Sequence, residues 1–265
     1  MESNSSTSPI EPTPSGSLNL LIVIPTYNER DNIPTLIPQI AAALPEAGLL
    51  LVDDGSPDGT ADLAEQLFQS YPNYRVMRRT GLRGLGRSYV DGFQWALRQG
   101  FDAAIEMDAD LSHDPKYLPT LAAGASQADL VIGSRYVAGG GVRDWPIQRV
   151  ILSRYANRYV RMIAGLRVND ATAGYRLYTR RALESISLHT IESNGYSFQV
   201  EMTYRVVHAG LNILEVPIIF TDRTAGHSKM SRSVIWESIL MPWRLRFGSS
   251  GRKARLDASP ISAKK

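Results

Sequence analysis

Two aspartates separated by a single residue have the spacing to bind a divalent cation. Asp108 and Asp110 follow a mostly apolar run, Phe101 to Met107. At the end of a strand, residues i and i+2 point to the same side, and Mg²⁺ and Mn²⁺ prefer oxygen ligands. Crowded carboxylates are costly unless a positive group lies among them. The pair therefore predicts a metal site that also holds phosphate groups; the alternative is that Asp110 only caps the following turn.

Two further polar clusters suit the recognition of a nucleoside. In PTYNE (25–29), the ring of Tyr27 offers a face for a base, and Glu29 can accept hydrogen bonds from ribose hydroxyls or base N–H groups. In DDGSPDGT (53–60), Asp54 is a similar acceptor, and the glycines allow a ligand to approach closely. We expect Asp58 to cap the next helix rather than to bind a ligand. For His113 we expect a turn or surface position.

Basic residues after residue 130 suit phosphate binding. Arg135 lies in GSRY, and Arg149 and Ser153 share a helix face because they are four residues apart. Arginine forks match phosphate oxygens. A second basic row on the same helix contains Arg154, Arg158 and Arg161. That row fits either a membrane-surface helix or an ordinary surface helix with solvated arginines.

A loop rich in small and basic residues, DRTAGHSKMS (222–231), joins Arg223 and Lys229 across a glycine. It is expected to be mobile and to close over phosphates. The alternative is a surface loop without a ligand.

Apolar runs of strand length alternate with helical patterns, which positions these clusters. Strands are expected at 18–24, 48–53, 74–79, 102–107 and 128–133, and helices at 32–44, 60–70, 84–99, 115–123 and 146–166. This order predicts an α/β fold with a mostly parallel central sheet flanked by helices. Four of the polar clusters follow strands, and parallel sheets bind ligands at the carboxyl ends of their strands.

Composition limits the remaining choices. The 265 residues are 43% hydrophobic, contain no cysteine and carry a formal charge of +3. No apolar run reaches the ~20 residues that a membrane span needs. We expect a disordered tail at 1–17, one domain at 18–247 and a basic disordered tail at 248–265. Residues 241–265 alone carry a net +6, which suggests an anionic surface; no motif supports nucleic acid.

The motifs VIPTYNE, VDDGSPDGT, DADLSHDP, GSRY and DRTAGHSKMS, in this order, resemble those of the dolichol-phosphate mannose synthases. These are inverting glycosyltransferases of family 2 with the GT-A fold, and the resemblance covers about residues 18–247. It implies transfer of mannose from GDP-mannose to a polyprenyl phosphate, with Mg²⁺ or Mn²⁺ as cofactor. Two alternatives are the same fold with another donor, such as UDP-glucose, and a nucleotide-sugar-binding partner without activity.

The resemblance also implies roles for individual residues. The guanosine part would be held by Pro25, Tyr27, Glu29, Val52 and Asp54. The sugar nucleotide and the metal would be held by Asp108, Ala109 and Asp110, with Ser112 where some relatives place a glutamine ligand. The acceptor phosphate would be held by Arg135, Arg149 and Ser153, and the donor pyrophosphate by Arg223 and Lys229. Of these, the resemblance implies catalytic roles for Asp108, Asp110 and Arg135.

A lipid acceptor implies work at a membrane surface. We expect peripheral binding on the cytoplasmic face, either directly or through a membrane-anchoring partner protein. Two segments suit the direct route: the basic amphipathic helix 146–166 and the C-terminal segment, whose apolar groups are Trp236, Ile239, Leu240, Trp243 and Phe247.

Overall fold

The computed structural model describes residues 18–191, 193, 195–222 and 232–248, and the side chains of 232–238 are not described. The predicted tails, apart from Gly248, therefore lie outside the described residues. So do Arg223 and Lys229, and the side chain of Trp236.

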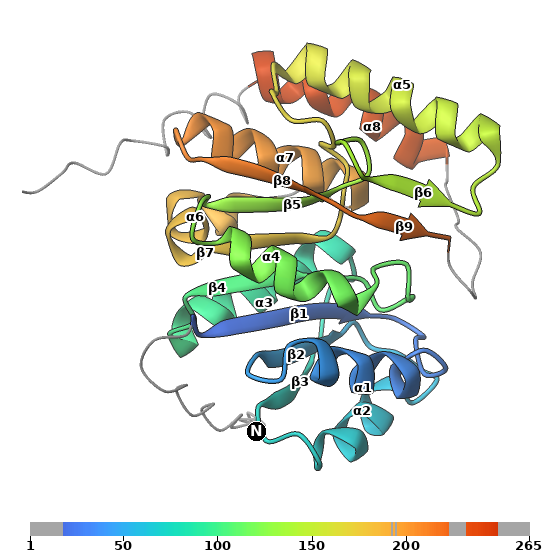
Figure 1. Ribbon diagram of the computed structural model, residues 1–265, viewed down its shortest axis with the longest axis vertical. Helices are drawn as coiled ribbons and strands as arrows, with labels where there is room; N and C mark the ends of the chain where they lie inside the picture. The colour runs from blue at the N-terminus through green and yellow to red at the C-terminus, as the bar shows by residue number, and fades with distance from the viewer. Residues whose placement is uncertain (1–17, 192, 194, 223–231, 249–265) are drawn as a thin grey trace, which may run out of the picture.

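A seven-stranded sheet forms the centre of the molecule (Figure 1). Its order is β3-β2-β1-β4-β7-β5-β8. The strands are β1 (Leu20–Thr26), β2 (Gly48–Asp53), β3 (Tyr74–Arg78), β4 (Ala103–Glu106), β5 (Leu130–Ser134), β7 (Arg176–Thr179) and β8 (Ile213–Pro217). Only β7 runs antiparallel to its neighbours. A separate two-stranded sheet is formed by β6 (Gly141–Arg143) and β9 (Ile219–Thr221), which run parallel.

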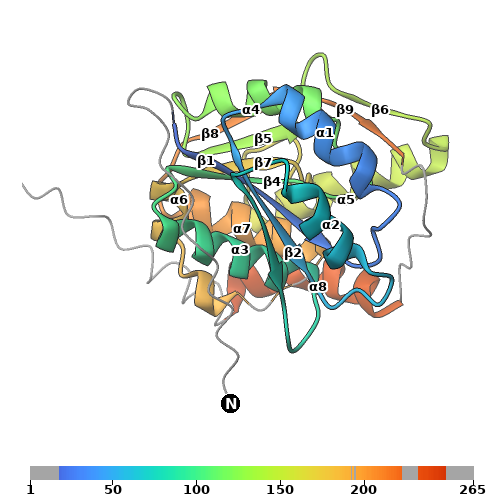
Figure 2. The same cartoon turned by 90° about the horizontal axis from the view of Figure 1, so that it is seen from below.

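Helices cover both faces of the sheet (Figure 2). Side chains of β1 alternate: Leu21 and Val23 pack with one helix layer, while Ile22 and Ile24 pack with the other. The first layer contains α3 (Leu85–Gln99), α6 (Arg180–Ser185), α7 (Gly195–His208) and the 3₁₀ turn η2 (Leu188–Thr190). The second contains α1 (Ile33–Ala43), α2 (Thr60–Phe68), α4 (Leu118–Gly124) and the 3₁₀ turn η1 (Pro115–Tyr117).

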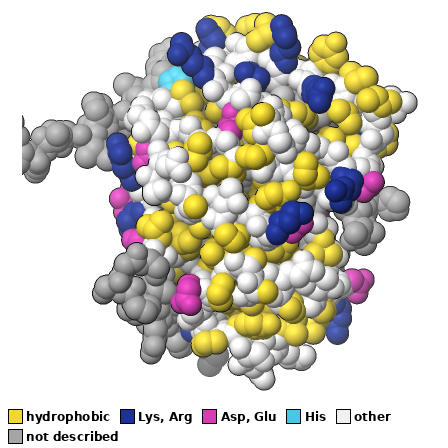
Figure 3. All heavy atoms as spheres, in the orientation of Figure 1, with side chains coloured by type: hydrophobic (Ala, Val, Ile, Leu, Met, Phe, Trp, Pro, Cys, Tyr) yellow, Lys and Arg dark blue, Asp and Glu magenta, His cyan; other side chains and the backbone are white. Residues whose placement is uncertain are grey.

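Two long helices lie together at one end of the molecule, at the top of Figure 1. They are α5 (Ile147–Ala164) and α8 (Arg232–Phe247), and α8 also packs on α7. Tyr159 of α5 joins the pair, because its hydroxyl donates to the carbonyl of Ile239 and accepts from Nε1 of Trp243. Figure 3 shows basic side chains among hydrophobic ones at this end.

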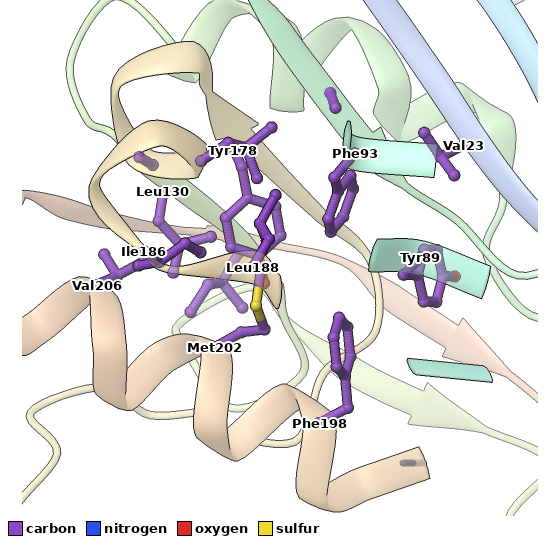
Figure 4. Close-up of a cluster of buried hydrophobic side chains, with 14 of the residues drawn as sticks. Val23, Tyr89, Phe93, Leu130, Tyr178, Ile186, Leu188, Phe198, Met202 and Val206 are labelled. Carbon is purple, nitrogen blue, oxygen red and sulfur yellow. The ribbon is translucent and has the colours of Figure 1, made fainter. Parts of the chain in front are cut away.

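Aromatic rings fix α3 against α7 in the core (Figure 4). The ring of Tyr89 stacks on Phe93 and on Phe198, and all three side chains are fully buried. Such pairs add to the free energy gained by burial. The packing holds the Tyr89 hydroxyl in place at the carboxyl end of β4.

The five predicted strands and the helices after them are confirmed, with boundaries that differ by a few residues. The mostly parallel sheet is also confirmed. The short strand β6, the antiparallel β7 and the strands after it were not predicted. β7 is a four-residue strand within a mixed polar and apolar segment, so its local pattern is weak.

Candidate functional site

The polar clusters gather at one edge of the sheet, as predicted. Strand β1 pairs in parallel with β2 and β4. Strand β5 runs in the same direction, because the antiparallel β7 lies between β4 and β5. Each of these four strands is followed directly by one of the clusters. Two cavities open near this edge. One is polar and the other is mostly apolar, and both border Arg135, Trp145, Arg149, Thr172 and Tyr196.

The polar cavity has a volume of about 220 Å³. Its wall combines one carboxylate, two guanidinium groups, several hydroxyls and an amide. The polar residues in its lining include Asp108, Ser112, His113, Arg135, Arg149, Thr172, Tyr196 and Gln199. Gly174 belongs to the same wall, and a Cβ there would lie 3.3 Å from Cε1 of His113 and 3.7 Å from Oδ2 of Asp108. A glycine thus lets the chain pass close to both groups.

Asp108 and Asp110 do not extend the strand, because β4 ends at Glu106. Asp108 lines the cavity and its Oδ1 accepts a hydrogen bond of 3.0 Å from the Tyr89 hydroxyl. Oδ1 of Asp110 accepts from the backbone N–H and the hydroxyl of Ser112, at 3.1 and 2.6 Å. The turn-capping contact, which was the alternative reading, is therefore present at Asp110. It occupies one carboxylate oxygen.

The donor atoms present are of the kind that a hard divalent cation prefers, although Asp108 and Ser112 line the polar cavity and Asp110 does not. Carboxylate and hydroxyl oxygens from Asp108, Asp110 and Ser112 lie within one short loop, and Mg²⁺ and Mn²⁺ bind such oxygens. Among the described residues, no group of three or more His, Cys, Asp and Glu could hold a metal ion. Phosphate oxygens and waters would have to complete the coordination, which is the usual arrangement for Mg²⁺ at a nucleotide.

His113 lies at a bend in the loop between β4 and η1, as the turn expectation has it, but it is buried, so the expected surface position was wrong. Its ring is only 2% exposed and stacks on Tyr175. Nδ1 accepts a hydrogen bond of 3.0 Å from the backbone N–H of Asp108. Burial lowers the pKa of His113 below its ordinary value, which favours the neutral ring that can accept this bond. The imidazole therefore holds the loop that carries Asp108.

Arg135 is held by a carboxylate that sequence reasoning missed. Its Nε and Nη2 donate to Asp170 in a fork, each at 2.7 Å, and Nη2 also donates to Thr172. Burial alone would lower the pKa of Arg135, but the charge of Asp170 outweighs it, so the pKa is raised and the guanidinium stays charged. The group also lies near the rings of Trp145 and Phe220. It borders both cavities as a fixed positive charge.

Arg149 and Ser153 lie on one face of α5, as predicted, and both border the apolar cavity. The guanidinium of Arg149 lies 3.9 Å from the ring centroid of Trp145 and donates to Asp222 at 2.7 Å. The hydroxyl of Ser153 accepts from the Tyr136 hydroxyl at 2.7 Å. The predicted contact of these two residues with an acceptor phosphate remains a prediction.

The second cavity is a mostly apolar groove of about 620 Å³ between α5, α7 and α8. Its apolar lining includes Leu152, Tyr155, Ala156, Tyr159, Val160, Val200, Ile239, Met241 and Pro242. Arg135, Arg149 and Trp145 stand where it meets the polar cavity. The combination suits a ligand with a long apolar chain and an anionic end.

The predicted nucleoside residues lie on β1, β2 and the loops after them, outside both cavities. Pro25 and Val52 are buried register partners. Tyr27 is exposed, and Arg83 covers its ring with the guanidinium 4.4 Å from the centroid and donates to its hydroxyl at 2.7 Å. Glu29 accepts from Asn32 at 2.6 Å.

Asp54 anchors the glycine-rich turn before α3. Its carboxylate pairs with Arg79 and accepts from the backbone N–H of Gly84 at 2.7 Å. The N-cap of α2 is Gly59, so the predicted N-cap position of Asp58 was wrong by one residue; Asp58 still accepts from the N–H of Thr60, the first residue of the helix, at 2.9 Å. Ala109 is buried. The contacts of these residues with a donor remain predictions.

Residues from the later part of the chain complete the site without having been predicted. Gln199 of α7 lines the polar cavity and donates to Glu106, which is fully buried. Burial raises the pKa of Glu106 to about 8. Asp170, Thr172 and Gly174 come from the segment before β7. The polar composition of DATAGYR (170–176) was the available signal.

The apolar side predicted for the helix 146–166 is divided: four of its residues face outward, Tyr159 and Ile163 are half-buried, and Leu166 is buried. Ile147, Ile151, Tyr155 and Met162 are 48–68% exposed, whereas the helix buries Asn157, Val160 and Ala164. Ile239, Leu240, Trp243 and Phe247 of α8 are also exposed. No helix among the described residues has the length and apolar character to cross a bilayer.

Comparison with known proteins identifies the family. The pattern of Glycosyl transferase family 2 matches residues 21–187. The chain is 48% identical over 230 residues to a polyprenol monophosphomannose synthase of Mycolicibacterium smegmatis, covering 85% of this chain and 87% of that one. It is 44% identical over 241 residues to an undecaprenyl-phosphate mannosyltransferase of Micrococcus luteus, covering 90% and 99%.

Solved structures share the fold at low identity. Glucosyl-3-phosphoglycerate synthase from Mycobacterium tuberculosis, in complex with Mn²⁺, UDP-glucose and phosphoglyceric acid, superposes with a TM-score of 0.63 at 19% identity over 85% of this chain and 80% of that one. A mannosyltransferase from Pyrobaculum calidifontis, in complex with GDP-mannose and Mn²⁺, gives 0.54 at 14% over 94% and 75%. These likenesses confirm the predicted GT-A-like α/β architecture, and the family match and the close relatives place the chain in glycosyl transferase family 2.

Proposed function

We propose that the protein transfers mannose from GDP-mannose to a polyprenyl phosphate and inverts the configuration at the anomeric carbon. The observation that carries the proposal is the apolar groove that meets a polar cavity beside Arg135 and Arg149. A lipid phosphate matches both ends, because its apolar chain suits the groove and its anionic group suits the two arginines, whereas a hydrophilic sugar acceptor has no apolar chain to fill the groove. The names of the two relatives above point to the same acceptor class and sugar.

The proposed reaction depends on positive groups that bind two anions more than on a group that removes a proton. A phosphate oxygen of the acceptor attacks C1 of mannose, and the bond from C1 to the diphosphate oxygen breaks with its electron pair leaving on GDP. A phosphate monoester is already largely ionised near neutral pH, so no general base is required. His113 is not available as a base through Nδ1, because that nitrogen already accepts a hydrogen bond from the backbone N–H of Asp108.

Positive groups must bring two anions together. Arg135, fixed by Asp170, and Arg149, stacked on Trp145, lie where the lipid phosphate would enter the polar cavity. Asp108, Asp110 and Ser112 would hold Mg²⁺ or Mn²⁺, and such an ion would offset the charge that the departing diphosphate gains. The Tyr89 hydroxyl orients the Asp108 carboxylate. Burial raises the pKa of Tyr89 well above its ordinary value, so it remains a donor.

Purified protein with a short polyprenyl phosphate and a panel of sugar nucleotides tests this function. GDP-mannose is expected to give polyprenyl-phosphate mannose with a β linkage, whereas UDP-glucose is expected to give little product. Preference for UDP-glucose would refute the donor, and the absence of transfer from any donor would support the non-catalytic alternative.

Substitution of Arg149 or Ser153 by alanine is expected to raise the KM for the lipid phosphate while GDP binding stays unchanged. Arg149→Ala should have the larger effect, about ten-fold to a hundred-fold, because a charge-assisted contact contributes about 1.5–3 kcal/mol. Steady-state kinetics give the KM and calorimetry gives GDP affinity. Arg143→Ala, an exposed arginine on β6, is the control. Loss of GDP binding with an unchanged acceptor KM would contradict the assignment.

A further inference from the structure

Helix α5 carries three distinct stripes along its length. Helix geometry places Leu152, Ala156 and Tyr159 on one face, and these residues line the apolar groove. Ile151, Tyr155 and Met162 form an exposed apolar ridge along the edge of the groove, and Tyr155 also belongs to the groove's lining. The third stripe, on the other side of the ridge, contains Arg154, Arg158 and Arg161.

The arginine stripe borders two open hollows of about 400 and 430 Å³. Arg154, Arg158 and Arg161 line the first hollow. Arg158 and Arg161 continue into the second, where Arg167 joins them just beyond the end of the helix. The hollows therefore bring four guanidinium groups to one side of α5, on the face opposite the groove. We name this set, Arg154, Arg158, Arg161 and Arg167, the arginine cluster.

No carboxylate among the described residues forms an ion pair with the arginine cluster. Some other arginines of the described chain have carboxylate partners: Arg78 pairs with Asp62 and Glu65, Arg135 with Asp170, and Arg205 with Glu201. The arginine cluster differs from single arginines without an ion pair in the described chain, such as Arg98, in that its members share the same hollows. Nε of Arg161 is buried and has no hydrogen-bond partner in the described structure. Guanidinium groups gathered without counter-ions repel each other and favour an anionic ligand.

We propose that the arginine cluster binds the phosphate headgroups of anionic phospholipids and so seats α5 on the bilayer. This deepens the proposed function, since a lipid acceptor brings this end of the protein to a membrane. With the ridge of Ile151, Tyr155 and Met162 in the interface, the arginines lie at the level of the lipid phosphates on one flank. The groove opens on the other flank, toward the acyl chains from which the acceptor enters.

The occupant is a bilayer rather than a soluble anion because of what surrounds the cluster. The arginines flank apolar side chains that are exposed along α5 and continue on α8 as Ile239, Trp243 and Phe247. Figure 3 shows this mixture of basic and hydrophobic side chains at the α5 end. Interfacial helices combine an apolar face with Lys and Arg beside it, whereas a site for free phosphate needs no apolar ridge.

The full-length double variant Arg154→Gln/Arg158→Gln tests the inference by co-sedimentation with vesicles. Wild-type protein is expected to bind phosphatidylglycerol-containing vesicles more tightly than pure phosphatidylcholine vesicles, and less tightly at high salt. The double variant should lose about thirty-fold in partitioning onto the anionic vesicles, which corresponds to about 1 kcal/mol for each arginine. Arg98→Gln/Arg181→Gln is the matched control, because both residues are exposed and lie on α3 and α6, away from α5.

Activity separates this inference from the proposed function. With a short acceptor dispersed in detergent, the double variant should transfer mannose at the wild-type rate, whereas with the acceptor in anionic vesicles its rate should fall. Unchanged vesicle binding by the double variant, or an equal loss in the control, would overturn the headgroup site. A competition experiment gives a further test, in which inorganic phosphate and chloride are added to the vesicles at the same ionic strength. If phosphate displaces the wild-type protein and chloride does not, the cluster binds a soluble anion and the headgroup site is overturned.

Discussion

Protein washed with EDTA is expected to lose mannose transfer, and Mg²⁺ or Mn²⁺ is expected to restore it. Asp108→Asn and Asp110→Asn should each lower the turnover by about 10³-fold or more, because the charge on the departing diphosphate would no longer be offset. Asp108 lines the polar cavity, and Asp110 shares its loop through Ser112. The measurement is initial rate at saturating donor and acceptor, with titrated metal.

Asp114→Asn provides the matched control for the metal assignment. Asp114 belongs to the same stretch of chain, but its carboxylate binds the side chain and the backbone N–H of Lys116. The control should keep its activity and its response to metal. Circular dichroism should show that all three variants are folded. Full activity of EDTA-washed enzyme would refute the metal site at Asp108 and Asp110, whatever the variants do.

Asp170→Asn is expected to lower the free energy of unfolding by about 3–5 kcal/mol, the usual cost of leaving one partner of a buried ion pair uncompensated. Asp170 is fully buried and Arg135 nearly so, and the fork between them is bidentate. The matched control is Asp62→Asn, since Asp62 pairs with Arg78 at the surface and such pairs contribute about 0–1 kcal/mol. Urea unfolding of both variants measures the difference.

The effect of Asp170→Asn should depend on pH in a defined direction. Burial alone would raise the pKa of Asp170, but the charge and hydrogen bonds of Arg135 outweigh burial and lower it. A lowered pKa means that the stabilisation is fully present above the ordinary carboxyl range and is lost as the pH falls through the lowered pKa. The difference in the free energy of unfolding between the wild type and the variant should therefore become smaller at acidic pH. If Asp170→Asn lowers the free energy of unfolding by less than about 1 kcal/mol at neutral pH, the Arg135–Asp170 ion pair is not essential to the fold.

Local sequence patterns were sufficient for the architecture of the first two thirds of the chain. Apolar runs such as LNLLIVI predict buried strands, and the helical patterns between the runs favour a mostly parallel sheet. The antiparallel β7, which follows α5, is the exception. Because ligand-binding residues of such sheets lie at the carboxyl ends of strands, the order of Tyr27, Asp54, Asp108 and Arg135 along the chain already placed them at one edge.

Contacts between distant segments decided what those residues can do. The partner of Arg135 is Asp170, and β7, the antiparallel strand, brings the segment that contains it back into the sheet. His113 lies in a polar stretch that reads as a turn, and it is buried because Tyr175 stacks on its ring. No local pattern encodes either contact, since both depend on which surfaces meet after the sheet has formed.

The groove and the outward apolar ridge of α5 also depend on tertiary structure. An amphipathic pattern fixes which residues of a helix share a face, but not which face the rest of the protein covers. Here α8 packs on α5, and the side of α5 that carries Val160 and Ala164 is buried, whereas Ile151 and Tyr155 stay exposed. The sequence alone determined the stripes of α5. The packing of α5 against α8, with α7 across the groove, decided which stripe became the wall of a lipid-sized groove, because burial is a property of the assembled surface and not of the helix.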